Sequence, residues 1–509
     1  MPLPPCLFSR AATMPAHLVA KHLLLAAALV VVPPAPLQAA PMLPPAVAAV
    51  LQRERIPAEA LSVVVEEVGA EANAGGANAA GSPPARSVRL RHQADRPLNP
   101  ASLMKLLTTY AALDLLGPAW TWNTPVWLNG EVHDGVLDGS LIIQGRGDPK
   151  LVLERVWLLL RRVQQAGVRE IRGDIVLDGS VFAPPRAAPG DFDNEPLRPY
   201  NVRADALLLN QKTVVYRFTP DTARQVAVVS ADPVLAGAAV QAEVPLAAGA
   251  CGDWRGALRA RFEEPSNVRF EGRYAEACGE RQWPVADQQP QTYAARLIAQ
   301  MWEDAGGRLA GRVREGSAPT ATPPSFEFAS PPLAEVVRDI NKYSNNVMAQ
   351  QLFLTLGLER GGQGSPEAAR EVLLRWLADR LRLPAAALHG LQLDNGSGLS
   401  RDTRLTAGLL SRMLQSAWRS PVMPDLVASL PATATDGTLR RSQAPAGRAH
   451  LKTGSLRDVA GVAGYVLGDS GRRYLVVAIV NHPNAAAARP AFDALVQWTL
   501  DDGPAGGPP

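Results

Sequence analysis

The pattern of hydrophobic and polar positions predicts strands near both ends of the chain. Residues 61–68 (LSVVVEEV) and 87–92 (SVRLRH) are rich in β-branched residues, as are 459–468 and 472–481 near the other end. Segments with helical spacing lie between these two groups. This order predicts that the two ends of the chain contribute strands to one sheet.

Apolar residues at helical spacing recur in six segments. The first, 99–117, ends at Gly117, a residue typical of helix ends. The segment 330–357 is predicted to hold one long amphipathic helix that runs through the KYSNN sequence. The other helices are expected at 152–167, 291–306, 367–383 and 485–500.

The middle of the chain is predicted to be rich in β-structure. Residues 122–145 alternate like a hairpin system, with Asn-Gly and Asp-Gly sequences expected at the bends. Residues 173–182 read as a strand, and 205–285 as a run of short strands. If both ends share one sheet, this middle region is an insertion. The Gly- and Ala-rich stretch 69–85 is expected to be a flexible loop.

Composition narrows the class of protein. The chain has 509 residues, of which 47% are hydrophobic and 19% charged, and this excludes bulk disorder. The formal net charge of +3 is too balanced for a dedicated nucleic-acid binder. The length predicts two to four domains.

The first 40 residues resemble a cleavable secretory signal. A basic start is followed by the apolar run LLLAAALVVV at 23–32, which is too short to span a bilayer, and by small residues for cleavage. Met14 is an alternative to Met1 as the start. No later run reaches spanning length. Cleavage removes Cys6 and leaves Cys251 and Cys278, which we expect to form a disulfide in an oxidising compartment.

The first chemical motif is Ser102-Leu103-Met104-Lys105, near the start of a predicted helix. The i, i+3 spacing puts Ser102 and Lys105 on one face. A serine hydroxyl becomes a good nucleophile only when a base takes its proton. Lys105 can be that base if its pKa is lowered, and the positive end of the helix and a second cation would both act in that direction.

The second motif is Lys452-Thr453-Gly454-Ser455, ahead of the last two predicted strands. An edge strand here can pair with an extended peptide. Gly454 lacks the side chain that would block close approach. The side chains of Lys452, Thr453 and Ser455 can gather around an anionic terminus.

The third motif is Ser344-Asn345-Asn346. A hydroxyl can relay a proton between a lysine and a leaving amine, and an asparagine can hold both a substrate amide and a lysine. Taken in order, S-x-x-K, S-x-N and K-T-G are the signature of penicillin-recognising serine hydrolases.

The chain resembles the penicillin-binding protein 4 type of D-alanyl-D-alanine carboxypeptidase/endopeptidase, the class C low-molecular-mass group. Besides the three motifs, the resemblance rests on sequences such as GRGDPKL (145–151), DNGSGLSR (394–401) and DGTLRR (436–441). The family fills the long gap between the first two motifs with two extra domains. One departure is DNGSG, where the family is expected to have DGSG; we expect it to affect the loop's shape more than the chemistry.

The resemblance implies a role for each residue. Ser102 attacks the carbonyl between two terminal D-alanines, Lys105 takes its proton, and water later releases the acyl-enzyme. Ser344 passes a proton to the departing D-alanine, while Asn346 orients Lys105 and the substrate amide. Lys452 helps to keep Lys105 neutral, although which lysine is the base is disputed across such enzymes.

The same resemblance implies a substrate-binding strand. Thr453 and Ser455, which flank Gly454, bind the terminal carboxylate. The backbone amides of Ser102 and Ser455 form the oxyanion hole.

The implied fold is α/β (α+β), a β-lactamase/transpeptidase-like core of antiparallel sheet flanked by helices, with two β-rich domains inserted in it. The expected boundaries are a signal peptide at 1–40, the core at 41–121 and 323–500, inserted domain II at 122–204 and 289–322, inserted domain III at 205–288, and a disordered tail at 501–509.

The implied partners are peptidoglycan stem peptides, with β-lactam antibiotics as inhibitors in the periplasm. No nucleic acid, metal or other cofactor is implied, and a homo-oligomer stays open. Since no water-activating glutamate is visible beside Ser344, we expect slow deacylation of a penicillin adduct. Two alternatives remain: a β-lactamase or esterase on the same scaffold, and a catalytically inactive peptidoglycan-binding protein.

Overall fold

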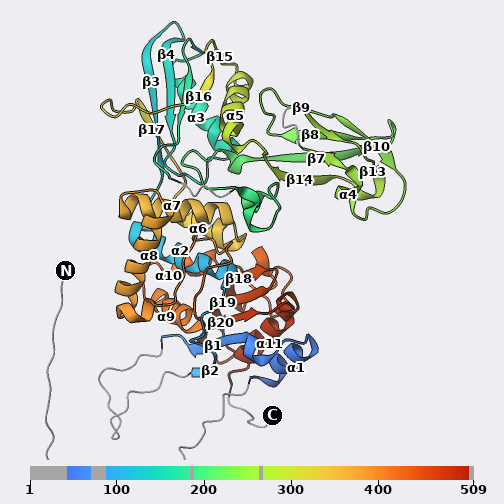
Figure 1. The fold of residues 1–509 in the computed structure, drawn as a ribbon, viewed down its shortest axis with the longest axis vertical. Coiled ribbons are helices and arrows are strands. Elements are labelled where there is room, and N and C mark those ends of the chain that lie inside the picture. Colours follow the sequence, from blue (N-terminus) through green and yellow to red (C-terminus); the bar gives the residue numbers. More distant parts are fainter. Residues whose placement is uncertain (1–42, 70–87, 184–187, 263–266, 504–509) are drawn as a thin grey trace, which may run out of the picture. The chain divides into compact units, whose positions relative to one another are not determined.

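Both ends of the chain contribute strands to one five-stranded antiparallel sheet. The computed structural model describes residues 43–69, 88–183, 188–262 and 267–503, so the expected signal peptide and most of the 69–85 loop lie outside the described residues. The strand order is β18-β19-β20-β1-β2 (Figure 1). The prediction that both ends share one sheet is therefore confirmed. The strands are β1 (Leu61–Glu67), β2 (Val88–His92), β18 (Ala449–Leu456), β19 (Val459–Leu467) and β20 (Arg473–Asn481).

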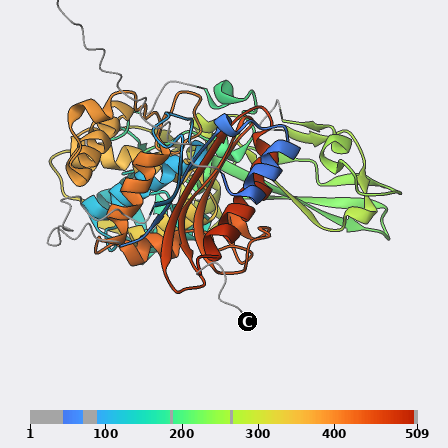
Figure 2. The ribbon, with the colours of Figure 1, turned by 90° about the horizontal axis from the view of Figure 1, so that it is seen from below.

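Helices cover both faces of this sheet, which is why its central strands are hydrophobic at nearly every position. Val63 and Val65 of β1 pack in one hydrophobic core with residues of α1 (Pro45–Arg53) and α11 (Arg489–Leu500). Figure 2 shows these two helices on the same face of the sheet. Val64, which points the other way, joins the core of the opposite helical layer. β18 stays at an edge of the sheet, as predicted. On its outer side, residues 431–433 form backbone hydrogen bonds with Ala449 and Leu451, whereas no described strand pairs with 452–456 there.

The opposite layer consists of helices that carry two of the three motifs. It contains α2 (Met104–Leu116), α6 (Leu333–Lys342), α7 (Asn346–Gly361), α8 (Pro366–Leu381), α9 (Ala407–Trp418) and α10 (Met423–Ser429). α2 follows the 3₁₀ turn η2 (Ala101–Leu103) and ends at Gly117, where φ is +88°. The helices α1, α9 and α10 were not predicted from the apolar spacing of the sequence.

The predicted long helix through KYSNN is wrong, because the chain breaks there. α6 ends at Lys342 and α7 begins at Asn346. Ser344 has φ +56°, a left-handed conformation that ends a helix. Asn345 then caps α7, its Oδ1 accepting a hydrogen bond of 3.0 Å from the amide of Met348. The break places Ser344 in a short loop instead of inside a helix.

A seven-stranded sheet forms the first part of the inserted region. Its strands are β3 (Asn123–His133), β4 (Val136–Gln144), β5 (Glu170–Ile171), β6 (Ile175–Asp178), β15 (Arg308–Leu309), β16 (Val313–Glu315) and β17 (Phe326–Ala329); its helices are α3 (Leu153–Gln165) and α5 (Pro290–Asp304). Asp134-Gly135, both with positive φ, turn the β3–β4 hairpin as predicted. The bend predicted at Asn129-Gly130 is wrong, because both residues are paired inside β3.

Two small sheets form the rest of the insertion. The first has the order β13-β10-β8-β7-β14 and the second β11-β12-β9. Their elements are β7 (Thr213–Asp221), β8 (Val226–Asp232), β9 (Ala239–Val240), β10 (Glu243–Ala247), α4 (Trp254–Leu258), β11 (Ala260–Arg261), β12 (Asn267–Phe270), β13 (Tyr274–Ala275) and β14 (Arg281–Ala286). A disulfide links Cys251 and Cys278, with 4.6 Å between their Cα atoms.

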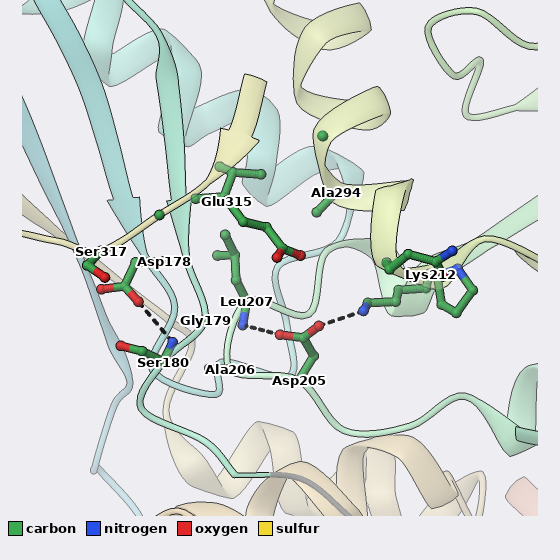
Figure 3. A pocket seen from close by; sticks show the side chains of 15 residues that line it. Asp178, Gly179, Ser180, Asp205, Ala206, Leu207, Lys212, Ala294, Glu315 and Ser317 are labelled. Atoms are coloured by element: carbon green, nitrogen blue, oxygen red, sulfur yellow. Dashed lines mark hydrogen bonds and ion pairs between the residues drawn. The ribbon is translucent and has the colours of Figure 1, made fainter. Parts of the chain in front are cut away.

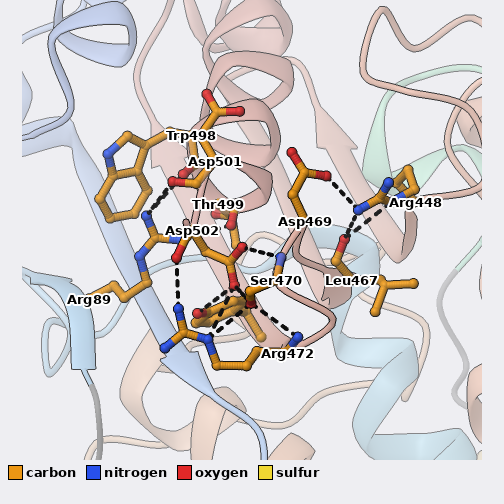
Figure 4. Close-up of polar contacts among 11 residues, drawn as sticks. Arg89, Arg448, Leu467, Asp469, Ser470, Arg472, Trp498, Thr499, Asp501 and Asp502 are labelled. Carbon is orange, nitrogen blue, oxygen red and sulfur yellow. Dashed lines mark hydrogen bonds and ion pairs between the residues drawn. The ribbon is translucent and has the colours of Figure 1, made fainter. Parts of the chain in front are cut away.

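A polar cluster fastens the end of α11 to the sheet (Figure 4). The buried carboxylate of Asp502 accepts hydrogen bonds from Ser470 and Tyr474, and Arg89 of β2 donates to carbonyls at the end of α11. The expectation of a disordered tail from residue 501 is thus wrong for Asp501–Gly503, because the Asp502 carboxylate is held by these donors. Within the described ranges, no helix combines the length and the apolar composition that crossing a bilayer requires.

Candidate active site

Ser102 lies in the η2 turn, and the backbone of this turn packs closely against two glycines. A Cβ atom on Gly454 would lie 2.8 Å from the carbonyl oxygen of Pro100, and one on Gly398 only 1.9 Å from that of Ala101. Both glycines are therefore required by the fold around the η2 turn. For Gly454 this differs from our expectation, since the missing side chain makes room for η2 rather than for a peptide.

Lys105 has three polar neighbours. Its Nζ lies 3.0 Å from Oγ of Ser102 and donates hydrogen bonds of 2.6 Å to Oδ1 of Asn346 and 2.6 Å to the carbonyl oxygen of Ser397. A neutral amine has two N–H groups and one lone pair. In the neutral form, the two N–H groups donate to these two acceptors and the lone pair faces Oγ of Ser102, whereas a protonated Nζ donates to all three oxygens.

Burial favours the neutral form of Lys105. Its side chain is fully buried, and this desolvation lowers the pKa of Lys105 well below its ordinary value; the charge of Lys452 lowers it further. Desolvation, rather than the helix end that the sequence suggested, is the main cause.

A hydrogen bond from Lys452 links the second motif to the third. From the edge strand β18 its Nζ donates hydrogen bonds of 2.9 Å to Oγ of Ser344 and 2.8 Å to the carbonyl oxygen of Thr453. Burial lowers the pKa of Lys452 to about 7. The two lysines thus each contact one serine hydroxyl, Lys105 that of Ser102 and Lys452 that of Ser344.

The Ser344 loop is also supported from the insertion. Nδ2 of Asn345 donates a hydrogen bond of 3.2 Å to Oε1 of Gln211, just before β7. Asn210, Gln211 and Lys212 all have positive φ near 45°, a conformation that non-glycine residues seldom adopt in succession. Val347, at the start of α7, packs in a small apolar cluster with residues of this same region.

A cavity of about 370 Å³ opens at these residues. Ser102, Ser344, Thr453, Gly454 and Ser455 line it, so residues of all three motifs meet at one cavity. A nucleophile, a buried base and an edge strand with hydroxyl groups are what acyl transfer on an extended peptide requires. Cys251 and Cys278 lie elsewhere, in the insertion.

Two contacts of the site were not predicted from the sequence. The first is the carbonyl of Ser397, which the DNGSG loop presents to Lys105; Asn395, the extra residue, accepts from the amide and hydroxyl of Ser397. The second is Thr438 of DGTLRR, whose Oγ1 accepts a hydrogen bond of 2.7 Å from Thr453. In the sequence, both stretches contribute only to the family resemblance.

A larger cavity, of about 570 Å³, lies in the inserted region (Figure 3). Its charged lining includes the Asp205–Lys212 ion pair, at 2.5 Å, together with Asp178 and Glu315. The Asp178 carboxylate already accepts from Gln144 and from the amides of Ser180 and Ala318. None of the residues predicted for the catalytic site lines this cavity.

Comparison with known proteins agrees with this geometry. Residues 48–501 match the family model described as the D-Ala-D-Ala carboxypeptidase 3 (S13) family. A D-alanyl-D-alanine carboxypeptidase of Actinomadura sp. (strain R39) is 29% identical over 420 residues, which cover 77% of this chain and 74% of the relative. The D-alanyl-D-alanine carboxypeptidase DacB of Haemophilus influenzae is 23% identical over 396 residues, or 75% of this chain and 80% of the relative.

Solved structures show the same fold. The crystal structure of penicillin binding protein 4 (dacB) from Haemophilus influenzae has a TM-score of 0.68 at 21% identity and covers 88% of this chain and 99% of its own. A predatory endopeptidase from Bdellovibrio bacteriovorus, in complex with an immunity protein, has a TM-score of 0.50 at 15% identity, covering 87% of this chain and 93% of its own. The expected core with inserted β-rich parts is the fold of these proteins.

Proposed function

We propose, from the premise that this chain belongs to the D-Ala-D-Ala carboxypeptidase 3 (S13) family, that Ser102 is its nucleophile and Lys105 the base that activates it. The chain is a serine D,D-peptidase. The observation that carries the proposal is the arrangement around Lys105: its two N–H groups have acceptors in Asn346 and Ser397, and its lone pair is left for Ser102. Burial keeps this amine neutral, so it can take a proton.

Acylation follows from these contacts. Nζ of Lys105 takes the Oγ proton of Ser102 as Oγ bonds to the carbonyl carbon between the last two D-alanines. The amides of Ser102 and Ser455 then stabilise the oxyanion. When the C–N bond breaks, Ser344 gives a proton to the leaving nitrogen and is reprotonated by Lys452, its hydrogen-bond donor.

Deacylation reverses the proton movements. Water attacks the ester carbon, a water proton returns to Lys452 through Ser344, and Lys105 returns its proton to Ser102.

Thr453 and Ser455 bind the carboxylate of the departing residue, and Asn346 orients the substrate amide beside Lys105.

The substrates are peptidoglycan stem peptides. They are cleaved either at their terminal D-alanyl-D-alanine or at D-alanyl cross-links. β-Lactams mimic this dipeptide and acylate Ser102. A Haemophilus influenzae structure of the same fold is described as a complex with a novel β-lactam, which supports such binding. Peptidoglycan lies outside the cytoplasmic membrane, so the signal-like first 40 residues support a periplasmic location.

The test is the intact-protein mass over time after addition of benzylpenicillin. We expect a persistent covalent adduct on the wild type, none on Ser102→Ala, and full modification of Ser180→Ala, an exposed serine that does not line the cavity at Ser102. A Ser102→Ala protein that still releases D-alanine from a muropeptide would contradict the mechanism. If the wild type stays unmodified while benzylpenicillin is hydrolysed, the protein is a β-lactamase. If the wild type stays unmodified and benzylpenicillin stays intact, the protein is an inactive wall-binding protein.

A further inference from the structure

The end of helix α6 is tied to the segment that leads into β18. Lys342, the last residue of α6, lies two residues before Ser344, and its side chain is buried. Its Nζ donates a hydrogen bond of 2.6 Å to Oδ2 of Asp436, and no other carboxylate of the described residues lies within ion-pair distance of it. The proposed mechanism uses neither Lys342 nor Asp436, although the pair adjoins the Ser344 loop.

The backbone around Asp436 is fixed on both sides. Its Oδ1 accepts a hydrogen bond of 2.9 Å from the amide of Ala432, which forms a bridge with His450 of β18. A Cβ atom on Gly437 would lie 2.5 Å from the carbonyl oxygen of Lys342, so the backbone at Gly437 packs directly against the end of α6. The segment 432–437 therefore joins the outer side of β18 to α6.

The next residue, Thr438, lines the catalytic cavity. Its Oγ1 accepts a hydrogen bond of 2.7 Å from Thr453 of β18, and Lys452, the neighbour of Thr453, donates one of 2.9 Å to Oγ of Ser344. These contacts close a ring, which runs through Ser344, Lys342, Asp436, Thr438, Thr453 and Lys452. The ring holds together Ser344 and Lys452, the two residues that protonate the leaving group in the proposed function.

The ion pair of this ring compensates a buried charge. Burial acts to raise the pKa of Asp436, but the hydrogen bond from Lys342 prevails and lowers it, so Asp436 is ionised at pH 7. Burial, together with the charge of Lys342, lowers the pKa of His450 below its usual value, so this neighbour is neutral. A buried ammonium group that loses its partner is strongly unfavourable. We therefore expect the end of α6, and Ser344 with it, to shift when Asp436 loses its charge.

We propose that Lys342 and Asp436 are positioning residues that hold Ser344 within hydrogen-bond distance of Lys452 and thereby govern protonation of the leaving nitrogen. The inference rests on the proposed function, in which Ser344 passes a proton to that nitrogen. Ser102 and Lys105 contact each other from η2 and the start of α2, so activation of the nucleophile depends less on the position of Ser344. The pair should therefore matter most for a leaving group that needs a proton.

Two matched substrates test this dependence. Both have the same acyl-D-alanyl part; one ends in D-alanine and the other in D-thiolactate, in which sulfur replaces the N–H group. An amine must be protonated as its C–N bond breaks, whereas a thiol has a pKa of about 8.5 and leaves as the thiolate. In Asp436→Asn and in Lys342→Met we expect kcat/KM to fall about tenfold for the peptide and by less than about twofold for the thioester, because small misplacements of a reacting group are costly. The double variant should fall no further, since the pair acts as a unit.

Asp339→Asn is the matched control. Asp339 lies one turn earlier in α6 and pairs with Lys150 at 2.7 Å, outside the ring, so its variant should keep the wild-type ratio of the two kcat/KM values. An unchanged ratio in Asp436→Asn, including an equal fall for both substrates through loss of structure, would overturn the inference. An equal change of the ratio in Asp339→Asn would overturn it as well.

Ser344→Ala separates the inference from the proposed function. If Ser344 gives the proton, this variant also loses activity on the peptide more than on the thioester. A wild-type ratio in Ser344→Ala refutes the proposed role of Ser344, and the inference with it. A lowered ratio in Ser344→Ala together with a wild-type ratio in Asp436→Asn refutes the inference alone.

Discussion

At the residue scale, Lys105 and Lys452 determine what the site can do. Transfer of an ammonium group into a protein interior is costly, so a buried lysine tends to give up its proton. Two buried lysines in one network add mutual repulsion to this cost. The oxygens of Asn346, Ser397 and Ser344 that face these amines are uncharged, so they do not offset the cost of a buried ammonium as a carboxylate would.

Because the charge of Lys452 lowers the pKa of Lys105, removal of Lys452 is predicted to shift the pH dependence of acylation. Acylation by benzylpenicillin should rise with pH as Lys105 loses its proton. In Lys452→Met the nearby positive charge is gone, so the pKa of Lys105 rises. We expect slower acylation and a pH–rate profile whose acid limb is displaced to higher pH. The measurement is the second-order rate constant of acylation at each pH, from rapid-quench mass spectrometry or stopped-flow fluorescence.

Lys150→Met serves as the control for this experiment. Lys150 pairs with Asp339 at 2.7 Å and does not line the catalytic cavity. Its variant should leave the midpoint of the acid limb unchanged. A Lys452→Met limb at the wild-type pH, or one displaced to lower pH, would contradict the coupling.

The residue types of the site were predictable from the sequence, but not all their contacts. Ser102, Lys105, Ser344 and Lys452 carry distinctive chemistry, so their order and spacing identify them. Ser397 contributes only a backbone carbonyl, which every residue has. Such a contact has no signature in a sequence and becomes visible only when the DNGSG loop folds over α2.

At the element scale, the break between α6 and α7 positions Ser344 and Asn346, two residues of the candidate site. Asn346 begins α7, so its side chain is fixed to the helix, while Ser344 is in the preceding loop. Apolar periodicity continues across the break, which is why the sequence predicts one helix. The left-handed φ of Ser344 depends on tertiary contacts, such as that between Asn345 and Gln211.

The effect of the Asn345 cap on the candidate site can be measured separately from its effect on helix stability. Asn345→Ala removes the cap of α7, and Ser365→Ala removes the corresponding cap of α8, where Oγ accepts from the amide of Ala368. Each should lower the free energy of unfolding by about 1 kcal/mol, measured in urea. Only Asn345→Ala should also slow benzylpenicillin acylation, by about tenfold, because it misplaces Ser344 and Asn346.

Equal acylation rates for these two variants would show that the loop is held without Asn345.

The two caps also differ in how readily a sequence reveals them. The capping residues Asn345 and Ser365 are both of the expected type. Only Ser365 precedes an obvious start, Pro366, whereas Asn345 lies inside a continuous periodic stretch.

At the scale of the whole molecule, the polar cluster around Asp502 fastens the last residues to the sheet (Figure 4). Burial acts to raise the pKa of Asp502, but hydrogen bonds from Ser470 and Tyr474 prevail and lower it to about 2. A carboxylate with a depressed pKa contributes stability above its unfolded pKa of about 4, and loses it as pH falls toward 2.

Asp502→Ala should therefore lower the free energy of unfolding by about 1–3 kcal/mol at pH 7. The difference from wild type should shrink between pH 4 and about 2. Asp501→Ala is the neighbouring control, because the Asp501 side chain is exposed. If both variants unfold alike in urea at pH 7, the cluster does not stabilise the molecule.

The arrangement of the central sheet has a consequence for synthesis. A ribosome adds about 5–20 residues per second and makes the amino end first. Ser102 and Lys105 are completed early, but β18, β19 and β20 come last, and Lys452 with them. Until then Lys105 lacks the neighbouring charge of Lys452, one of the two causes that lower its pKa. A prematurely terminated chain that ends before β18 therefore lacks Lys452 and the edge strand, so the candidate site is assembled only when the last strands have been made.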